Sequence, residues 1–304
     1  MDNETSVWKT GPFWLLMAIL ALVAALLFMG VRYRDVTVGM EIVPKVMARK
    51  AAVLSAIRVH MIKSVDAEKS AVMADTDGAS AAFAEESARW AEAVEKGLQE
   101  LDQLIEAYPS EREVKLLKEF KGCWAEFRAI DRAVLEIAVQ NSNLKAARLS
   151  FDAARDALTR FEGALAQLMQ GREGGPICGL ASHALAAALN IQVLHAPHIA
   201  SPSDEEMDGL EKTIRENDAM ARRSLNALQP LVSPDRQPAL RQAQAAYDEF
   251  AKVTASVIKL SRQNTNIKSL ELSLNRKRNI TSQCDEILTS LQDAVQSRSF
   301  KATR

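Results

Sequence analysis

Three histidines lie close together in the second half of the chain, and imidazole nitrogen is a common metal ligand. His183, His195 and His198 fall within 16 residues, near Cys178. A spacing of three residues would place His195 and His198 on one helix face, where they could bind a metal ion or haem iron. Pro197 lies between them, however, and the alternative is a set of solvated or locally hydrogen-bonded histidines near a helix end. The residue types favour this second interpretation.

A second candidate site combines two tryptophans with two arginines. A guanidinium group binds carboxylates through paired hydrogen bonds, and aromatic rings commonly line ligand pockets. A ligand-binding pocket between helical bundles could be lined by Trp90, Trp124, Arg128 and Arg132. The alternative, which the residue types favour, places the tryptophans in a core and the arginines in solvent.

No catalytic signature accompanies these residues. A nucleophile elbow, a phosphate loop, HExxH and a dinucleotide fingerprint are all absent from the sequence, so we expect neither an enzyme nor a cofactor. The net charge of −1 over 304 residues gives no electrostatic footprint for nucleic acid. The basic stretch "LNRKRN" at 274–279 lacks interleaved aromatic residues, so a solvated or partner-facing patch is expected there.

The three cysteines form no recognisable pattern. Cys123, Cys178 and Cys284 are an odd number without close spacing, which predicts neither a disulfide framework nor haem attachment. Cys284 falls on an apolar helical stripe and Cys123 neighbours Trp124. Both are expected to be small buried hydrophobic residues, with a reactive thiol as the alternative.

Helices must position all of these residues. Twelve Gly and nine Pro are few for this length, and apolar residues recur every three or four positions between Leu117 and Ile137. The pattern returns 123 residues later, where "VQNSNLKAARLS" at 139–150 matches "RQNTNIKSLELS" at 262–273. "WAEF" likewise becomes "YDEF". Self-similarity at one fixed offset predicts a tandem duplication.

Each predicted copy divides into four helical stretches, which predicts antiparallel helices joined by short loops. They lie near 40–75, 80–108, 111–139 and 143–170, and then near 177–197, 204–230, 235–262 and 266–297. The predicted fold is all-α, with an N-terminal transmembrane helix followed by two tandem antiparallel four-helix bundles. The expected divisions are a tail (1–10), an anchor (11–31), a first bundle (32–172) and a second bundle (173–304).

The repeated segment marks the turn between the third and fourth helices of each copy. Asn141 can adopt the left-handed conformation that ends a helix, and Ser142 or Asn143 can cap the next one. The stretch 264–266 repeats the same chemistry.

The segment 11–31 carries no charge, and about twenty helical residues span the roughly 30 Å of bilayer hydrocarbon. A cleaved signal peptide is the alternative, but its apolar region is shorter and ends in a small-residue site. Basic residues mostly follow the segment, which by the positive-inside rule favours a cytoplasmic C-terminal region.

The helical stretches "AEKSAVMADTD", "GLQELDQLIEAY" and "LLKEFKGCWAEFRAIDRAVLEIA" resemble the four-helix-bundle sensor domain of bacterial methyl-accepting chemotaxis receptors. The resemblance covers residues 10–170. The second copy shares it mainly because it matches the first copy. The resemblance implies a single-pass protein of the bacterial inner membrane with periplasmic bundles, against the positive-inside rule. The fourth helix ends in "GREGGPICG" (171–179) and leads to no second span or signalling hairpin. A truncated receptor is therefore a further possibility.

We therefore expect a membrane-anchored, non-catalytic, sensor-like protein of signal transduction that binds a small ligand or a protein partner. Its expected partners are the lipid bilayer and proteins of a membrane complex or receptor array, with no nucleic acid. The alternative is a structural, single-span scaffold subunit of a larger membrane complex.

Overall fold

The computed structural model describes residues 11–170 and 175–302, and it describes side chains for 17–29, 44–170 and 175–298. All regular elements in these ranges are helical and none is a strand, which confirms the all-α class. The helices are α1 (Gly11–Met73), α2 (Asp77–Ala107), α3 (Glu111–Ala138), α4 (Ser142–Leu149), α5 (Arg155–Met169), α6 (Pro176–Ala200), α7 (Asp204–Leu228), α8 (Gln237–Gln263), α9 (Thr265–Leu272) and α10 (Arg278–Ala302).

Three short segments of other helical geometry interrupt this series. They are the π-helices η1 (Ser150–Ala154) and η3 (Ser273–Lys277) and the 3-10 helix η2 (Pro234–Arg236). The predicted tail, residues 1–10, lies outside the described residues, as do residues 171–174 of the predicted joint.

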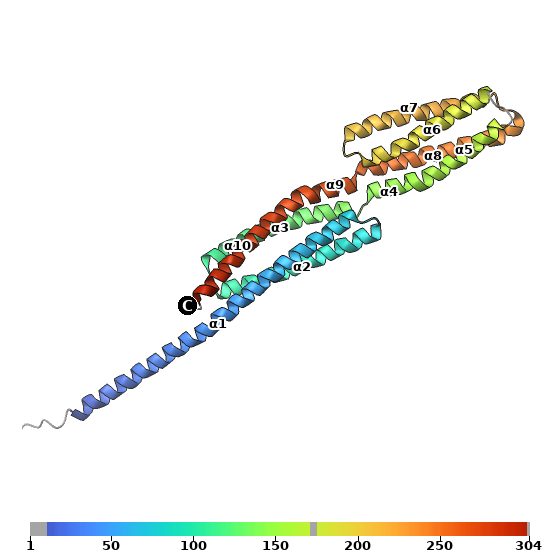
Figure 1. Ribbon diagram of the computed structural model, residues 1–304. Helices are drawn as coiled ribbons and strands as arrows, with labels where there is room; N and C mark the ends of the chain where they lie inside the picture. Colours follow the sequence, from blue (N-terminus) through green and yellow to red (C-terminus); the bar gives the residue numbers. More distant parts are fainter. Residues whose placement is uncertain (1–10, 171–174, 303–304) are drawn as a thin grey trace, which may run out of the picture. The chain divides into compact units, whose positions relative to one another are not determined.

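Six of the eight predicted helical stretches each correspond to one α-helix, while the stretches near 143–170 and 266–297 are each divided by a π-helix. The first stretch is longer than predicted, because α1 is one helix of 63 residues. Figure 1 shows α1 as a continuous ribbon. The apolar segment and the first bundle helix are therefore parts of the same helix.

Two helices have marked apolar character. Residues Met17–Met29 of α1 form a short apolar stretch, and their side chains are exposed. Among the described residues, α6 is long and apolar enough to cross a membrane by length and composition. About a third (33%) of its most apolar segment is buried within the fold. In the fold, α6 packs against α5, α7 and α8.

The chain forms two compact units, and neither is a consecutive stretch of sequence. Unit 1 comprises the described residues of Met1–Met61, Glu92–Trp124 and Ser282–Arg304, and unit 2 comprises those of Ile62–Ala91 and Ala125–Thr281. This differs from the predicted division into 32–172 and 173–304. The fourth helical stretch of each predicted copy packs with helices of the other copy.

Unit 1 receives buried apolar side chains from four helices: Leu54 of α1, Leu101 of α2, Phe120 of α3 and Leu288 of α10. Helices α1 and α2 approach closely at Gly97. A methyl group added there would lie 2.7 Å from Ile57 Cγ1. The glycine therefore permits this helix contact.

In unit 2, α5 lies beside α8 and α6 lies beside α7 (Figure 1). These four helices share one core, which includes Phe161, Leu165, Ala184, Leu225, Tyr247 and Phe250. The rings of Phe161 and Tyr247 lie 5.3 Å apart between centroids. Thus α5 closes a core whose other three helices come from the second predicted copy.

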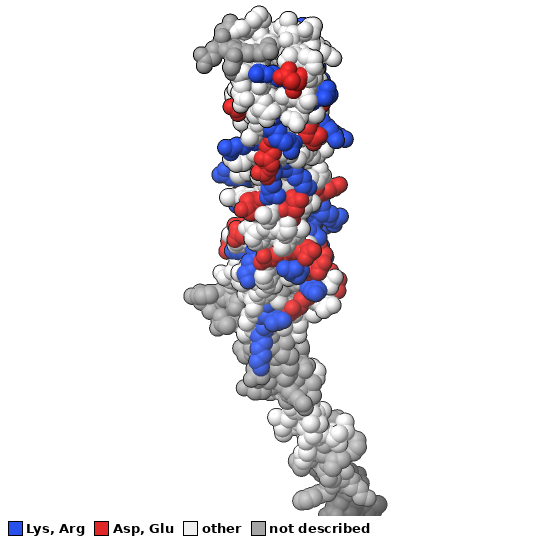
Figure 2. Space-filling model, turned by 90° about the vertical axis from the view of Figure 1, so that its right-hand side faces the viewer, with Lys and Arg blue, Asp and Glu red and all other residues white. Residues whose placement is uncertain are grey.

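Acidic and basic side chains are interspersed on the face drawn in Figure 2. No broad basic surface is visible on that face, in keeping with the balanced charge of the sequence.

Candidate functional site

Two polar turns of unit 2 bond to each other. Asn141 and Asn264 begin them in the left-handed conformation, with φ of 49° and 54°, which confirms the conformation predicted for Asn141. Asparagine tolerates this region better than most residues do. The amide nitrogen of Ser142 donates to Thr265 Oγ1 at 2.9 Å, and that of Thr265 donates to Ser142 Oγ at 3.0 Å.

The next residues repeat this exchange. The amide of Asn143 donates to Asn266 Oδ1, and the amide of Asn266 donates to Asn143 Oδ1, both at 3.2 Å. The predicted capping of each helix by its own turn is therefore wrong. Helix α4 begins at Ser142, and Asn141 in its cap position makes no side-chain cap bond. The Ser142 hydroxyl instead accepts a hydrogen bond from the first amide of α9. We call residues 141–143 and 264–266 the crossing turns.

A π-helix follows each crossing turn at the same interval. Such segments accommodate one extra residue and occur often at functional sites. Ser150 starts η1 and Ser273 starts η3, again 123 residues apart. Each π-helix contributes to a buried polar cluster.

The cluster at η1 contains a neutral histidine. His195 is buried, with Nδ1 3.0 Å from Ser150 Oγ and Nε2 3.1 Å from Thr254 Oγ1. Burial, together with a smaller electrostatic effect of the neighbouring His198, lowers the pKa of His195 to about 4. The ring is therefore uncharged at neutral pH and bridges α6, η1 and α8.

His198 lies one turn further along α6 and is also buried. Its Nδ1 lies 2.8 Å from Ser261 Oγ, and its Nε2 lies 3.2 Å from Glu211 Oε1. Arg262 donates to the same carboxylate oxygen at 2.6 Å. Four residues thus connect α6, α7 and α8 through one polar network.

The predicted metal ligands therefore have protein partners. Both ring nitrogens of His195 and of His198 face hydrogen-bonding side chains, while His183 is exposed. Among the described residues, no group of three or more His, Cys, Asp or Glu side chains is arranged to hold a metal ion.

The cluster at η3 is charged. Lys277 Nζ lies 2.5 Å from Asp131 Oδ1, and both side chains are at most 1% exposed. The ammonium also lies 3.3 Å from the ring centroid of Phe127, and Arg128 contacts Asp131 at 3.2 Å. Burial lowers the pKa of Lys277 to about 8, against the opposing effect of Asp131.

Glu68 of α1 completes this cluster. It is fully buried, and burial raises its pKa, an effect that the Ser273 hydroxyl and the Lys277 ammonium partly offset. The prediction of a solvated basic patch at 274–279 is wrong for Lys277. The available signal was its position, because Lys277 falls on the same helical stripe as Ile280, Cys284 and Leu288.

The four predicted ligand residues occupy different surroundings. Trp90 Nε1 donates to Glu86 at 3.2 Å, and Lys63 Nζ lies 4.1 Å from the Trp90 ring. Trp124 is buried in unit 1, whereas Arg132 is exposed in unit 2.

Arg128 is mostly buried and forms an ion pair with Asp131. The groove between α5 and α8 and the hollow between α1 and α2 are lined by other residues. A pocket built from these four residues therefore stays a prediction.

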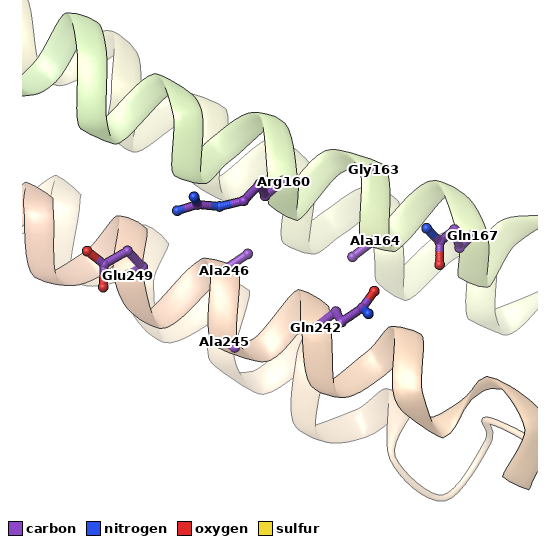
Figure 3. A pocket seen from close by; sticks show the side chains of 8 residues that line it. All are labelled: Arg160, Gly163, Ala164, Gln167, Gln242, Ala245, Ala246 and Glu249. Atoms are coloured by element: carbon purple, nitrogen blue, oxygen red, sulfur yellow. The ribbon is translucent and has the colours of Figure 1, made fainter.

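An open groove of about 490 Å³ lies between α5 and α8. Figure 3 shows the side chains that line it: Arg160, Gly163, Ala164 and Gln167 from α5, and Gln242, Ala245, Ala246 and Glu249 from α8. Small residues form its centre, and polar groups stand toward its ends. A second hollow of about 320 Å³ lies in unit 1 between α1 and α2.

In unit 1 a buried ion pair joins α1 to α3 beside Arg298 of α10. Lys50 Nζ lies 2.6 Å from Glu113 Oε2, and both side chains are fully buried. Lys50 and Arg298 donate to the carbonyl oxygen of Tyr108 at 2.8 and 3.1 Å. Two cations therefore meet the C-terminal end of α2, where the helix dipole favours positive charge.

Arg58 makes a second connection to α10. Its Nε lies 2.9 Å from Asp285 Oδ1, and its two terminal nitrogens donate to Thr289 Oγ1 at 2.6 Å and Gln292 Oε1 at 3.2 Å. These acceptors lie on one face of α10, so a single α1 side chain contacts two turns of the last helix.

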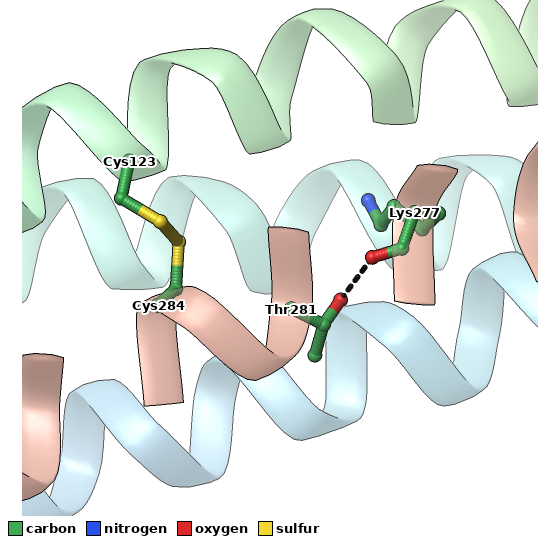
Figure 4. Close-up of a disulfide and its surroundings, with 4 residues drawn as sticks. All are labelled: Cys123, Lys277, Thr281 and Cys284. Atoms are coloured by element: carbon green, nitrogen blue, oxygen red, sulfur yellow. Dashed lines mark hydrogen bonds between the residues drawn. A yellow bond between two sulfur atoms is a disulfide. The ribbon is translucent and has the colours of Figure 1, made fainter. Parts of the chain in front are cut away.

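A disulfide joins Cys123 of α3 to Cys284 of α10 (Figure 4). The expectation of two unpaired apolar cysteines is therefore wrong. The two residues are 161 positions apart in sequence, yet their Cα atoms lie 5.7 Å apart because α10 returns to unit 1. Cys178 is not part of a disulfide.

Sequence comparisons place the chain in no group: no family model matches it, and no curated protein matches it. A solved structure does share its fold, namely the sensor domain of the histidine kinase TorS from V. parahaemolyticus. The TM-score is 0.56 and the identity 11%, over 83% of this chain and 97% of that one. At this identity the likeness shows the helical fold alone, and the resemblance to chemotaxis receptors stays a prediction.

Proposed function

We propose that this chain is a membrane-anchored, non-catalytic, sensor-like protein of signal transduction that binds a small ligand or a protein partner. The observation that carries the proposal is the fold shared with a histidine kinase sensor domain over nearly the whole length of that domain. A fold alone does not define a function, so the argument also needs features of this chain.

The first such feature is α1. Its apolar stretch exposes large side chains, including Leu20, Leu22, Leu27 and Phe28, to an extent unusual for a water-soluble helix. A lipid bilayer would cover them. Because α1 runs without interruption to Met73, the proposed anchor and the first bundle helix belong to one continuous helix.

The second feature is the disulfide, which supports an oxidising compartment. Disulfides persist outside the cytosol, including in the bacterial periplasm. This supports placing the bundles in the periplasm, against the basic residues that follow the apolar segment. A large domain can be translocated despite such flanking charges.

The third feature is the set of connections between α1 and buried polar groups. Glu68 of α1 lies in the η3 cluster, and Lys50 and Arg58 of the same helix contact the network around α10. Buried polar networks have strict geometric requirements. In our proposal, ligand or partner binding shifts helix positions, and α1 transmits the shift to the membrane.

The experiment uses the full chain in spheroplasts and then in detergent. We expect the protein to remain in alkali-washed membranes and to be cleaved by protease added to spheroplasts. We also expect the purified chain to gain thermal stability with a cell extract below about 1 kDa or with a partner isolated by native pull-down. Recovery in the soluble fraction would contradict the anchor. Stoichiometric recovery within a large assembly, without any ligand effect, would favour the scaffold alternative.

A further inference from the structure

The charged cluster at η3 contains one carboxyl group whose bonding capacity is not used. Glu68 of α1 is fully buried, and in the described part of the chain neither of its side-chain oxygens has a hydrogen-bond partner. We propose that Glu68 is a proton-binding site, which holds a proton while α1 is packed in unit 2 and releases it when α1 loosens. The inference rests on the proposed sensor function only in that α1 carries the change to the membrane.

The cations near Glu68 are bound to another carboxylate. Lys277 Nζ lies 2.5 Å from Asp131 Oδ1, and Arg128 Nη1 lies 3.2 Å from Asp131 Oδ2. Asp131 thus takes a hydrogen bond or ion pair on both of its oxygens, and its charge opposes ionisation of Glu68. A buried carboxylate without a hydrogen-bond donor is costly, and such a group binds a proton instead.

The surroundings of Glu68 bring few charges to it. The charged groups of the cluster are Asp131 and Arg128 of α3, Lys277 of η3 and Lys69 of α1 itself. From α2, the side chains that bond to this part of α1 are the uncharged Ser80 and Ser87. Lys277 is therefore the cation on which ionised Glu68 would depend, and Asp131 already binds it.

The matching position 123 residues later shows that the fold accepts an uncharged side chain here. That residue is Ile191, which is 2% exposed in the core of unit 2. Thr254 likewise matches Asp131, and Ala154 matches Lys277. The three charged residues of the η3 cluster thus correspond to three uncharged residues at η1. This supports the protonated, neutral Glu68 as the packed form.

Loss of the proton changes the balance of charge within the cluster. Two buried carboxylates then compete for the Lys277 ammonium, which Asp131 binds at 2.5 Å. Ionised Glu68 needs water or a new donor, and either requires α1 to move away from α3 and η3. Acidic conditions therefore favour the packed form of α1, and alkaline conditions favour its loosening.

The test compares the pH dependence of unfolding of the full chain in detergent, for the wild type and E68Q, between about pH 5 and pH 7.5. Burial raises the pKa of Glu68 above 4.5, so the folded wild type binds more protons than the unfolded chain. As the pH rises, the wild type should lose stability relative to E68Q. The ratio of their unfolding constants should change about tenfold per pH unit until the folded pKa is passed.

Two comparisons make this result specific to Glu68. His195 acts with the opposite sign over part of the range, but it is present in both proteins and cancels in their difference. D66N changes an exposed carboxylate of the same helix and should follow the wild-type curve. A constant difference between wild type and E68Q, or one that grows in the opposite direction, would overturn the proposal, because Glu68 would then be ionised in the folded chain.

A second variant and a direct readout cover the case in which E68Q does not fold. E68I copies Ile191 at the matching position and allows the same comparison. Infrared spectra of the folded wild type at about pH 6, where exposed glutamates are largely ionised, should show a carboxylic acid band. Absence of this band in the wild type would overturn the proposal.

Hydrogen exchange measures the response of α1. After correction for the intrinsic effect of pH on amide exchange, residues 62–73 should exchange faster in the wild type as the pH rises, and should not do so in E68Q. Equal behaviour of the two proteins would overturn the loosening of α1.

Failure of this inference can be told from failure of the sensor function. If wild type and E68Q show parallel pH curves while small-molecule extract stabilises both, the sensor function stands and the proton site fails. If the chain is recovered in the soluble fraction while the pH difference is present, the proton site stands and its connection to the membrane fails.

Discussion

Ser142 and Thr265, 123 residues apart, cap each other's helices: the amide of each donates to the side-chain oxygen of the other, at 2.9 and 3.0 Å. Both residues are buried. The two hydroxyl oxygens also lie 3.1 Å apart. The start of α4 and the start of α9 therefore depend on one another.

The first prediction concerns these caps. Ser142→Ala removes the acceptor for the Thr265 amide and should lower the free energy of unfolding by about 1 kcal/mol. The double change of Ser142 and Thr265 to Ala should cost less than the sum of the single changes, because the hydroxyls share a contact. Thermal unfolding of the full chain, followed by circular dichroism, measures both effects. Strict additivity would contradict the mutual dependence, and Ser256→Ala on an exposed face of α8 is the control.

The second prediction concerns the pH dependence of stability. The pKa of His195 falls from 6.5 to about 4 on folding, so its contribution is present above pH 6.5 and is lost as the pH falls through 4. The loss can reach roughly 3 kcal/mol, because one pKa unit corresponds to about 1.4 kcal/mol.

His195→Gln keeps hydrogen-bonding capacity and removes this titration. The variant should therefore lose less stability than the wild type between pH 7 and pH 4, as measured by thermal melts across that range. His183→Gln, at an exposed position, should follow the wild-type curve. Parallel curves for wild type and His195→Gln would contradict the assignment.

The third prediction concerns the buried pair Lys277–Asp131. Asp131→Asn leaves an ammonium group buried without its counter-charge and should destabilise the chain by roughly 3–5 kcal/mol. The double variant Asp131→Leu, Lys277→Met should be less destabilised than Asp131→Asn, because the buried ammonium group is then removed together with its counter-charge. Chemical unfolding measures both. A mild effect of Asp131→Asn would mean that the pair is hydrated in solution.

The fourth prediction concerns the disulfide. Non-reducing electrophoresis should show a faster-migrating band that is lost in Cys123→Ala and in Cys284→Ala. Loss of the bond should lower stability by roughly 2–5 kcal/mol, since it closes a long loop in the unfolded chain. Cys178→Ala should leave mobility and stability unchanged. A reduced Cys284 in protein isolated from membranes would contradict the bond and remove its support for a periplasmic location.

Parts of the candidate site could be found from sequence, and others could not. The histidines were identified by type and spacing, but their partners Ser150, Thr254 and Ser261 come from other helices and carry no local signal. Lys277 lies within a basic stretch that resembles a solvated surface, and its place on an apolar helical stripe was the one indication of its burial. The spacing of the cysteines gave no hint of their pairing, because 161 residues separate them.

The sequence by itself determined where helices form, because apolar residues at intervals of three and four, with turn residues between them, are a local property of the chain. It also predicted the left-handed Asn141 and the matching segment 123 residues later. The tertiary structure alone decided which helices pack together. The two predicted copies have equivalent apolar stripes, so each fourth helix could pack against the other three helices of either copy. The sequence pattern does not distinguish these two arrangements. Contacts distant in sequence, made by the crossing turns within unit 2 and by the disulfide and the Arg58–Asp285 ion pair within unit 1, exist only in the exchanged arrangement.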